Sequence, residues 1–269
     1  MRQLSSLENF IDRHRRLFVL TGAGCSTGSG IPDYRDADGQ WKRAQPVTFQ
    51  AFMGDEKNRR RYWARSLVGW RRIRQAQPNG AHRALARLEA MDRIELVLTQ
   101  NVDRLHQAAG SARVIDLHGR IDLVRCMDCE ARSPREDLQS ELGRLNPSWL
   151  DLDATEAPDG DADLDGADFS SFAVPSCRRC GGVLKPDVVF FGENVPRERV
   201  NAAARGLDEA DAMLIVGSSL MVYSGFRFVQ RAAEAGKPVA AVNLGRTRAD
   251  ALLTLKAEQA CESALAFLL

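Results

Sequence analysis

The sequence predicts an α/β fold, with a mostly parallel, Rossmann-like sheet covered by helices and a small metal-binding lobe inserted into it. Short apolar runs that end in Gly, Asn or Thr alternate with longer amphipathic stretches, which is typical of strands followed by helices. These runs are residues 17–21, 94–99, 212–217 and 238–243. The alternation stops between Cys126 and Cys180. A separate lobe is therefore expected there, inside the larger domain.

The chain length fits this division, because 269 residues are enough for one large core and a smaller lobe. We expect residues 1–120 and 183–269 to form the larger domain and residues 121–182 to form the lobe. Residues 151–168 are rich in Asp, Gly and Ala and nearly lack apolar side chains. They predict a mobile acidic loop within the lobe.

Charge and hydropathy exclude several classes of partner. The 37 Lys and Arg nearly cancel the 36 Asp and Glu, so we expect no nucleic-acid partner. The first residues lack a basic head followed by a long apolar run, and no later apolar stretch reaches the length of a membrane span. The sequence thus predicts neither export nor membrane insertion, and we expect a cytoplasmic protein.

Four of the six cysteines form two Cys-x-x-Cys pairs, Cys126 with Cys129 and Cys177 with Cys180. In a chain without a secretion signal this pattern favours metal over disulfides. Four thiolates suit tetrahedral zinc with no open position, so we expect one structural Zn²⁺ per chain. Cys25 and Cys261 stand alone and are interpreted as small buried apolar residues.

Glycines follow the 17–21 strand at Gly22, Gly24 and Gly28. Such a turn lets backbone amides approach a pyrophosphate closely. The spacing is one residue longer than the common dinucleotide fingerprint, and the usual acidic residue on a second strand is missing. A hydride-transfer dehydrogenase is thus disfavoured. The alternative is a flexible loop whose glycines supply positive φ angles.

Other strand ends carry polar or small residues that we expect at the same crevice. Residues 217–219 and 243–245 offer hydrogen bonds for a ribose and an adenine, or are ordinary loop residues. Asn101 and Asp103 follow the 94–99 strand and either orient a ligand or cap the next helix, and Asp33 has the same two interpretations.

His118 directly follows Ile115-Asp116-Leu117, the end of a largely apolar run. A strand end there exposes an imidazole that accepts a proton near neutral pH, so His118 is the candidate general base. The alternative is a structural histidine, which is the commoner role for a lone one.

Taken together and in order, these motifs resemble the sirtuin family over nearly the whole chain. They are GAGCSTGSGIPDYR at 22–35, TQNVD at 99–103, HG at 118–119, the two cysteine pairs, KPDVVFFGE at 185–193, GSS at 217–219 and NLG at 243–245. RYWAR at 61–65, VGW at 68–70, LNPSW at 145–149 and APDG at 157–160 are similar to class II sirtuins, the group that includes the fourth human sirtuin. We expect a bacterial member and a single sirtuin-type catalytic region spanning 1–269.

The resemblance implies an NAD-dependent protein-lysine deacylase that releases lysine, nicotinamide and O-acyl-ADP-ribose. The acyl oxygen attacks the anomeric carbon, and His118 then deprotonates a ribose hydroxyl. Asn101, Asp103 and Asp33 position the ribose and nicotinamide. The implied NAD-binding residues are Gly22, Ala23, Gly24, Thr27, Ile31, Pro32, Asp33, Tyr34, Arg35, Gln100, Asn101, Val102, Asp103, Gly217, Ser218, Ser219, Asn243, Leu244, Gly245 and Cys261.

The same resemblance places an acyl-lysine peptide as an added strand against Gly192, Glu193, Val222 and Tyr223. The chain departs from its relatives at two positions. Cys25 and Gly28 stand where sirtuins often carry an aliphatic residue and Glu, which puts the conformation of the cofactor loop in question.

Tyr62 and Arg65 share a helix face, and their spacing is similar to that of sirtuins that remove succinyl or glutaryl groups. They predict binding of an acidic acyl group, unless Arg65 only belongs to a solvated basic face. Two other functions remain as alternatives: an ADP-ribosyltransferase that uses NAD, and a non-catalytic module that senses NAD or acyl-lysine.

Overall fold

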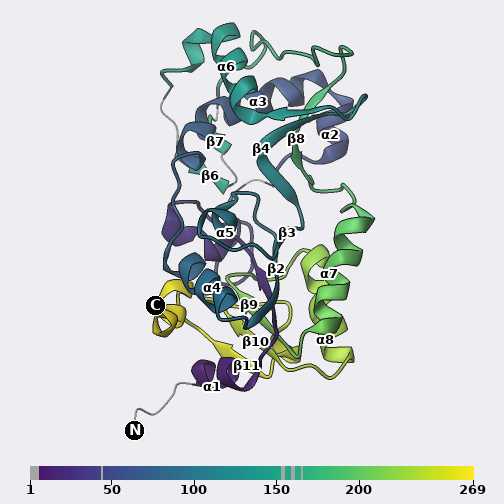
Figure 1. The fold of residues 1–269 in the computed structure, drawn as a ribbon. Coiled ribbons are helices and arrows are strands. Elements are labelled where there is room, and N and C mark those ends of the chain that lie inside the picture. Colours follow the sequence, from purple (N-terminus) through teal and green to yellow (C-terminus); the bar gives the residue numbers. More distant parts are fainter. Residues whose placement is uncertain (1–5, 44, 153–154, 159–160, 165) are drawn as a thin grey trace.

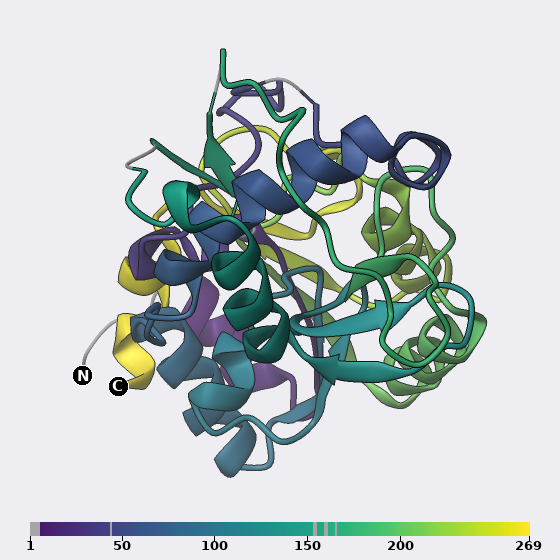
Figure 2. The same cartoon turned by 90° about the horizontal axis from the view of Figure 1, so that it is seen from above.

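The computed structural model describes residues 6–43, 45–152, 155–158, 161–164 and 166–269. Figure 1 shows a larger sheet domain that carries both ends of the chain and a smaller lobe at the opposite end of the molecule. In the view from above, the smaller lobe lies in front of the larger domain (Figure 2). Within the described residues, every helix is too short or too polar to cross a bilayer.

The larger domain contains a six-stranded sheet of order β11-β10-β9-β1-β2-β3. All neighbouring strands are parallel, which confirms the predicted α/β class. The strands are β1 (Leu17–Thr21), β2 (Ile94–Thr99), β3 (Val114–Asp116), β9 (Ala212–Val216), β10 (Val239–Val242) and β11 (Leu255–Ala257). Four of them coincide with the apolar runs of the sequence.

Helices cover both faces of this sheet. Alternate residues of each strand point to opposite faces and are buried against these helices. In β1, Leu17 and Val19 pack toward one face, and Phe18 and Leu20 pack toward the other. The first face is covered by α1 (Ser6–Arg13), α4 (Gly80–Ala90) and α9 (Cys261–Leu265). The second face is covered by α7 (Arg197–Glu209) and α8 (Tyr223–Glu234).

The strand order places a ligand crevice beside β1. From β1 the chain continues through β2 and β3 on one side, whereas β9, β10 and β11 extend the sheet on the other. The direction of progression therefore changes between β1 and β9. Ligands of open parallel sheets bind at such a point, outside the carboxyl ends of the strands.

The small lobe is built on an antiparallel sheet of β4 (Gly119–Cys126), β5 (Arg132–Pro134) and β8 (Leu184–Val188). Three helices pack with it: α2 (Phe49–Gly54), α3 (Glu56–Ile73) and α6 (Arg135–Leu145). Their shared core contains Trp63, Val124, Leu142 and Phe172. Two helices of this lobe thus come from chain that precedes the first cysteine pair.

The segment expected to be an acidic loop contains an antiparallel hairpin, formed by β6 (Thr155–Ala157) and β7 (Asp161–Asp163). Ala162 is buried, and Asp161 bonds to Arg65 of α3. This difference from a plain loop arises because a contact with α3, distant in sequence, fixes the strand. Residues 153–154, 159–160 and 165 of this segment lie outside the described residues.

The remaining short helices are α5 (Leu105–Ala108) and the 3₁₀ turns η1 (Ala23–Cys25), η2 (Thr27–Ser29), η3 (Pro147–Trp149), η5 (Asp250–Leu252) and η6 (Ala266–Leu268).

Candidate active site and metal centre

The glycine loop lies directly against the end of β9. The Gly24 amide donates to the Gly217 carbonyl at 2.9 Å, and Gly22 N donates to Val216 O at 3.1 Å. A Cβ on Gly24 would lie 3.0 Å from Gly217 O. Gly217 itself has a φ of +65°, and a Cβ there would lie 2.2 Å from Cys25 N. The glycines are thus required by backbone packing, and the simple flexible-loop interpretation does not explain them.

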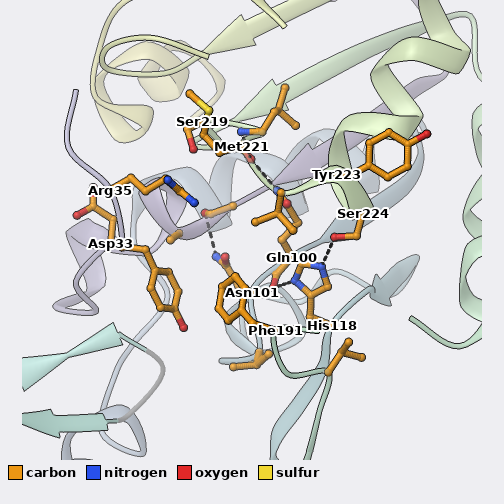
Figure 3. Close-up of a pocket in the computed structure, with 18 of the residues that line it drawn as sticks. Asp33, Arg35, Gln100, Asn101, His118, Phe191, Ser219, Met221, Tyr223 and Ser224 are labelled. Atoms are coloured by element: carbon orange, nitrogen blue, oxygen red, sulfur yellow. Dashed lines mark hydrogen bonds between the residues drawn. The ribbon is translucent and has the colours of Figure 1, made fainter. Parts of the chain in front are cut away.

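A cleft of about 360 Å³ opens at these strand ends. Figure 3 shows side chains from several strand ends and loops pointing into it. Most of the residues expected from the sequence line it: Gly22, Ala23, Gly24, Asp33, Tyr34, Arg35, Gln100, Asn101, Val102, His118, Gly192, Glu193, Gly217, Ser218, Ser219, Val222, Tyr223, Asn243 and Leu244. The parallel sheet therefore brings together residues that lie far apart in sequence.

His118 follows β3 and is held in one tautomer. Its Nδ1 lies 3.0 Å from the Gln100 carbonyl oxygen, which only accepts, so Nδ1 carries the hydrogen. Nε2 then holds a lone pair and accepts from the Ser224 hydroxyl at 2.7 Å. Removal from water lowers the pKa of His118 to about 4, although the Gln100 carbonyl opposes this shift. His118 is thus a neutral base whose free lone pair faces a hydroxyl group.

Asn101 is buried beside the glycine loop. Its amide nitrogen donates to Gly22 O and to Ser26 Oγ, both at 3.0 Å, which leaves the amide oxygen for a ligand. Asp103 lies behind this group, because the Ser26 hydroxyl donates to its carboxylate at 2.6 Å. Asp103 also accepts from Leu105 N and so caps α5. It supports the site through Ser26 and does not line the cleft.

On the other side of the cleft, Glu193 is tied down by its own contacts. Its carboxylate accepts from the Lys185 ammonium at 3.0 Å and from Phe190 N at 2.9 Å. The Lys185 side chain is almost fully buried, so this ion pair fixes the turn at residues 190–193. The turn and the segment 222–224 both line the cleft.

Five expected NAD contacts besides Asp103 are not among the residues that line the cleft: Thr27, Ile31, Pro32, Gly245 and Cys261. Thr27 is exposed and donates to Gly24 O. Ile31 packs in a core with Trp70 and Val102. Cys261 Sγ lies 3.5 Å from Gly24 O, behind the loop.

The cleft also contains residues that sequence reasoning missed: Trp41, Met221 and Arg227. Trp41 packs edge-on against Phe191 with ring centroids 5.5 Å apart, and the Arg35 guanidinium lies 3.9 Å from the Trp41 ring centroid. A lone aromatic residue in a loop gives no pattern by which the sequence could identify it.

Gly28, one of the two departures from the family pattern, has a structural explanation. A Cβ at Gly28 would lie 2.5 Å from a carboxylate oxygen of Glu262. The other carboxylate oxygen of Glu262 accepts from Gly80 N at 2.8 Å, at the start of α4. Glu262 thus fills the space next to Gly28 with a carboxylate supplied from the C-terminal helix α9.

Tyr62 and Arg65 line a second cavity of about 460 Å³, which shares Tyr34, Trp41, Phe190 and Phe191 with the cleft. Tyr62 packs against Phe190 with ring centroids 5.2 Å apart. The cavity is cationic, with Lys42, Arg43, Arg61 and Arg65 against Asp33 and Asp161. Arg65 Nη2 already lies 2.9 Å from Asp161 Oδ2, so its charge is matched by a carboxylate of the hairpin.

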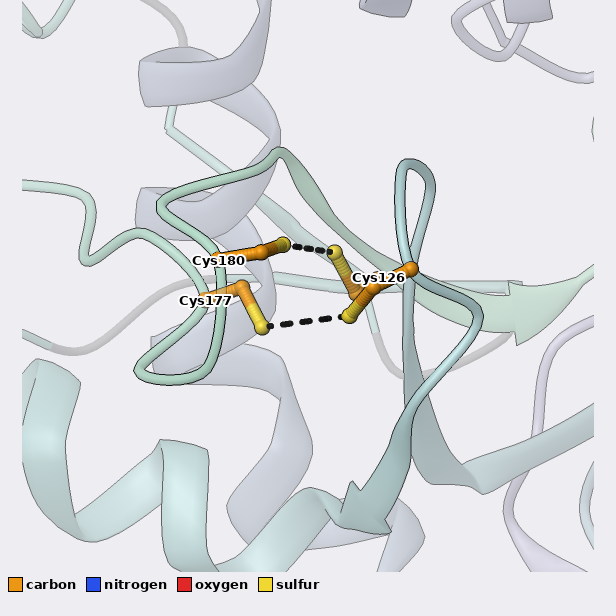
Figure 4. A group of neighbouring side chains, drawn as sticks. Cys126, Cys177 and Cys180 are labelled. Carbon is orange, nitrogen blue, oxygen red and sulfur yellow. Dashed lines mark hydrogen bonds between the residues drawn. The ribbon is translucent and has the colours of Figure 1, made fainter.

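The four cysteines of the two pairs meet in the small lobe, as Figure 4 shows for three labelled members. Cys126 and Cys180 sulfurs lie 3.5 Å apart, and Cys129 and Cys177 sulfurs lie 3.8 Å apart. A tetrahedral Zn²⁺ with bonds of about 2.3 Å requires sulfurs about 3.8 Å apart. The set therefore fits zinc, with no ligand position left for chemistry.

Comparisons with known proteins agree with this geometry. The Sir2 family model matches residues 22–224. A protein of Bradyrhizobium diazoefficiens named NAD-dependent protein deacetylase 2 is 72% identical, over 98% of this chain and 97% of its own. A NAD-dependent protein deacetylase of Xanthomonas campestris is 70% identical, over 98% and 90%.

Solved structures give the same result. A Sir2 protein with a p53 peptide and NAD⁺ matches with a TM-score of 0.77 and 31% identity, over 99% of this chain and 97% of that one. A Sir2 protein bound to acetylated peptide matches with a TM-score of 0.76 and 31% identity, over the same shares. This chain therefore belongs to the Sir2 family, the sirtuins.

Proposed function

We propose that this chain is an NAD-dependent protein-lysine deacetylase whose range extends to larger acyl groups. The relatives at 72% and 70% identity are named as NAD-dependent protein deacetylases. The observation that carries the proposal is the His118 tautomer, in which Nε2 holds a lone pair directed at a hydroxyl inside the cleft. A binding module would not need such a base.

Each wall of the cleft has a role in this reaction. The glycine loop lets its backbone lie close to the phosphates, and the Asn101 amide oxygen orients the ribose next to it. An acyl-lysine peptide lies between the turn at 190–193 and the segment 222–224. When bound, NAD supplies the ribose and a leaving nicotinamide.

His118 performs the proton transfer. In the structure, the Ser224 hydroxyl donates to Nε2 at 2.7 Å. A ribose hydroxyl that replaces Ser224 at this nitrogen would donate in the same way, and Nε2 would then take its proton. The Gln100 carbonyl stabilises the resulting imidazolium through the Nδ1 hydrogen.

Mass spectrometry of products tests this function. Purified protein is incubated with NAD and acetyl-, glutaryl-, hydroxymethylglutaryl-, lipoyl- and long-chain-acyl-lysine peptides. We expect O-acyl-ADP-ribose, reduced by roughly 10²- to 10⁴-fold in His118→Ala, since general base catalysis contributes about that factor. His14→Ala is the matched control, because His14 lies outside the cleft.

The alternatives predict different products. An ADP-ribosyltransferase would move labelled ADP-ribose from NAD to a protein, and a sensing module would bind NAD without any turnover. Either result, with no O-acyl-ADP-ribose from any peptide, would overturn the deacylase proposal.

The second cavity is our candidate for the acyl group. It shares four aromatic residues with the cleft and adds about 460 Å³ of space, more than an acetyl group needs. Its excess of cations favours a chain that ends in a carboxylate. Such a chain must compete with Asp161 for Arg65, so the hairpin would set how strongly acidic groups are preferred.

A further inference from the structure

A second cluster of potential metal ligands lies in the larger domain, away from the two cysteine pairs. It consists of Cys25, His82 and His106, whose potential ligand atoms all lie within 4.8 Å of one another. Cys25 ends η1 of the glycine loop, His82 lies in the first turn of α4, and His106 lies in α5. All three side chains are buried, with at most 1% of their surface exposed.

His106 has an unpaired nitrogen in this cluster. Its Nε2 lies 2.9 Å from the Thr21 hydroxyl, which itself donates to Thr99 Oγ1. The Thr21 oxygen thus accepts the Nε2 hydrogen, and Nδ1 carries a lone pair. Among the described residues, Nδ1 has no hydrogen-bond partner although it is fully buried. Buried polar atoms are nearly always paired, so this lone pair requires an explanation.

His82 can present its Nε2 to the same ion. Its Nδ1 accepts from Asn79 N at 3.3 Å and lies 3.0 Å from Asn79 Oδ1. A hydrogen on Nδ1 would instead be donated to Oδ1, in place of the bond from Asn79 N, and would leave Nε2 for an ion. A ligating histidine usually donates its other nitrogen to such a partner. Burial lowers the pKa of His82 to about 4 and that of His106 to about 3. Both rings therefore stay neutral, as metal ligands must be.

We propose that Cys25, His82 and His106 form a second metal site, for a thiophilic divalent cation of the zinc class. Zinc bonds of about 2.3 Å to sulfur and about 2.1 Å to nitrogen place ligand atoms about 3.5 to 4 Å apart. The potential ligand atoms of the three residues lie within 4.8 Å of one another, close to this spacing. On binding, Zn²⁺ replaces the thiol proton of Cys25, which is released to solvent, and the new bond is a thiolate–zinc bond.

A chain with an aliphatic residue in place of Cys25 would lack the sulfur ligand of this site. The cluster also adjoins the cleft, since the Ser26 hydroxyl lies 3.5 Å from His82 Nε2 and bonds to Asn101. It does not overlap the four-cysteine site, which lies in the small lobe.

Native mass spectrometry during a titration with Zn²⁺ tests the proposal. We expect two zinc ions per chain, one at the four cysteines and one at the new site. Cys25→Val should lose the second ion and keep the first. Cys261→Val is the matched control, because Cys261 is also a buried lone cysteine beside Gly24 but belongs to no such cluster within the part of the chain that the structure describes, and it should keep both ions.

Saturation of the unaltered protein with one zinc ion would overturn the proposal. So would a second ion that survives in Cys25→Val, which would lie elsewhere on the molecule. If Cys25→Val does not fold, X-ray absorption of the unaltered protein decides. The spectrum of two-zinc protein minus that of one-zinc protein should show one sulfur and two nitrogen ligands, and a shell without sulfur would contradict the site.

Discussion

The two parts of the molecule hold their sites in place by different means. In the larger domain, β1, β9 and β10 are buried along their whole length, so backbone pairing and packing on both faces fix the cleft. In the small lobe, β5 is exposed throughout and β4 is only half-buried. There, a metal centre and single side-chain contacts must supply what a two-sided core supplies elsewhere.

The two parts of the molecule should therefore respond to different kinds of substitution. A change in the larger domain should matter when it disturbs the backbone near the strand ends. A change in the small lobe should matter when it removes a ligand or a charge.

Loss of a zinc ligand should affect only the small lobe. In Cys177→Ser we expect loss of the zinc ion at the four cysteines and a destabilisation of several kcal/mol, because structural zinc binding is worth about 10 kcal/mol or more in small domains. Hydrogen exchange should show lost protection in β4 and β8 while β1 and β9 stay protected. Cys261→Ser is the control and should retain zinc. Equal loss of protection in both parts would contradict the contrast.

Gly217→Ala should destabilise the larger domain through its backbone. A Cβ at Gly217 would lie 2.2 Å from Cys25 N, whereas one at Gly236 meets nothing within 4 Å, although the φ angles are +65° and +67°. Gly236→Ala should therefore cost only about 1 to 2 kcal/mol of left-handed strain. We expect Gly217→Ala to cost about 2 kcal/mol more in urea unfolding. Equal midpoints for the two variants would show that the close approach has no energetic weight.

The pH dependence of kcat/KM should reflect the low pKa of His118. Only the neutral imidazole acts as a base, so activity falls when His118 gains a proton. Because burial lowers its pKa to about 4, the acid limb should have its midpoint near 4. An unperturbed histidine would give a midpoint of about 6.5. A measured midpoint near that higher value would contradict the effect of burial on His118 in the free enzyme.

The Arg65–Asp161 pair should give the smallest effect, on acyl preference alone. Asp161→Asn removes the competing charge, so the ratio of glutaryl to acetyl turnover should rise by about 10-fold, in line with one charge-assisted bond. Arg65→Met should lower the same ratio. Asp168→Asn is the control, since that side chain bonds only locally to Ser170. Unchanged ratios in both variants would exclude Arg65 as an acid-binding residue.

Much of the fold could be predicted because its signals are local. Apolar runs identified four strands of the large sheet, and glycines at 22, 24 and 217 marked the point where the backbones meet. Residues 151–168 were predicted to be a loop because their composition is that of a loop. Their hairpin instead depends on a contact with Arg65, in a helix distant in sequence. Propensity does not report such contacts.

The residues of the candidate site were also predictable only in part. Residues at strand ends, such as His118 and Asn101, were predictable because parallel strands bring their carboxyl ends to one edge. Asp103 and Cys261 lie beside the glycine loop in the structure but behind the cleft. One hydrogen bond decides this placement of Asp103, and no spacing along the chain encodes it.

From the sequence alone we could predict the α/β class, the four zinc-binding cysteines, the glycine loop and the candidate general base. Each of these features depends on residue types at short spacing along the chain, so it is visible without the tertiary structure. Only the tertiary structure decided the tautomer of His118, the pairing of Arg65 with Asp161, and the meeting of Cys25 with His82 and His106. Each of these needs atoms from separate elements within a few ångströms, and packing alone sets such distances.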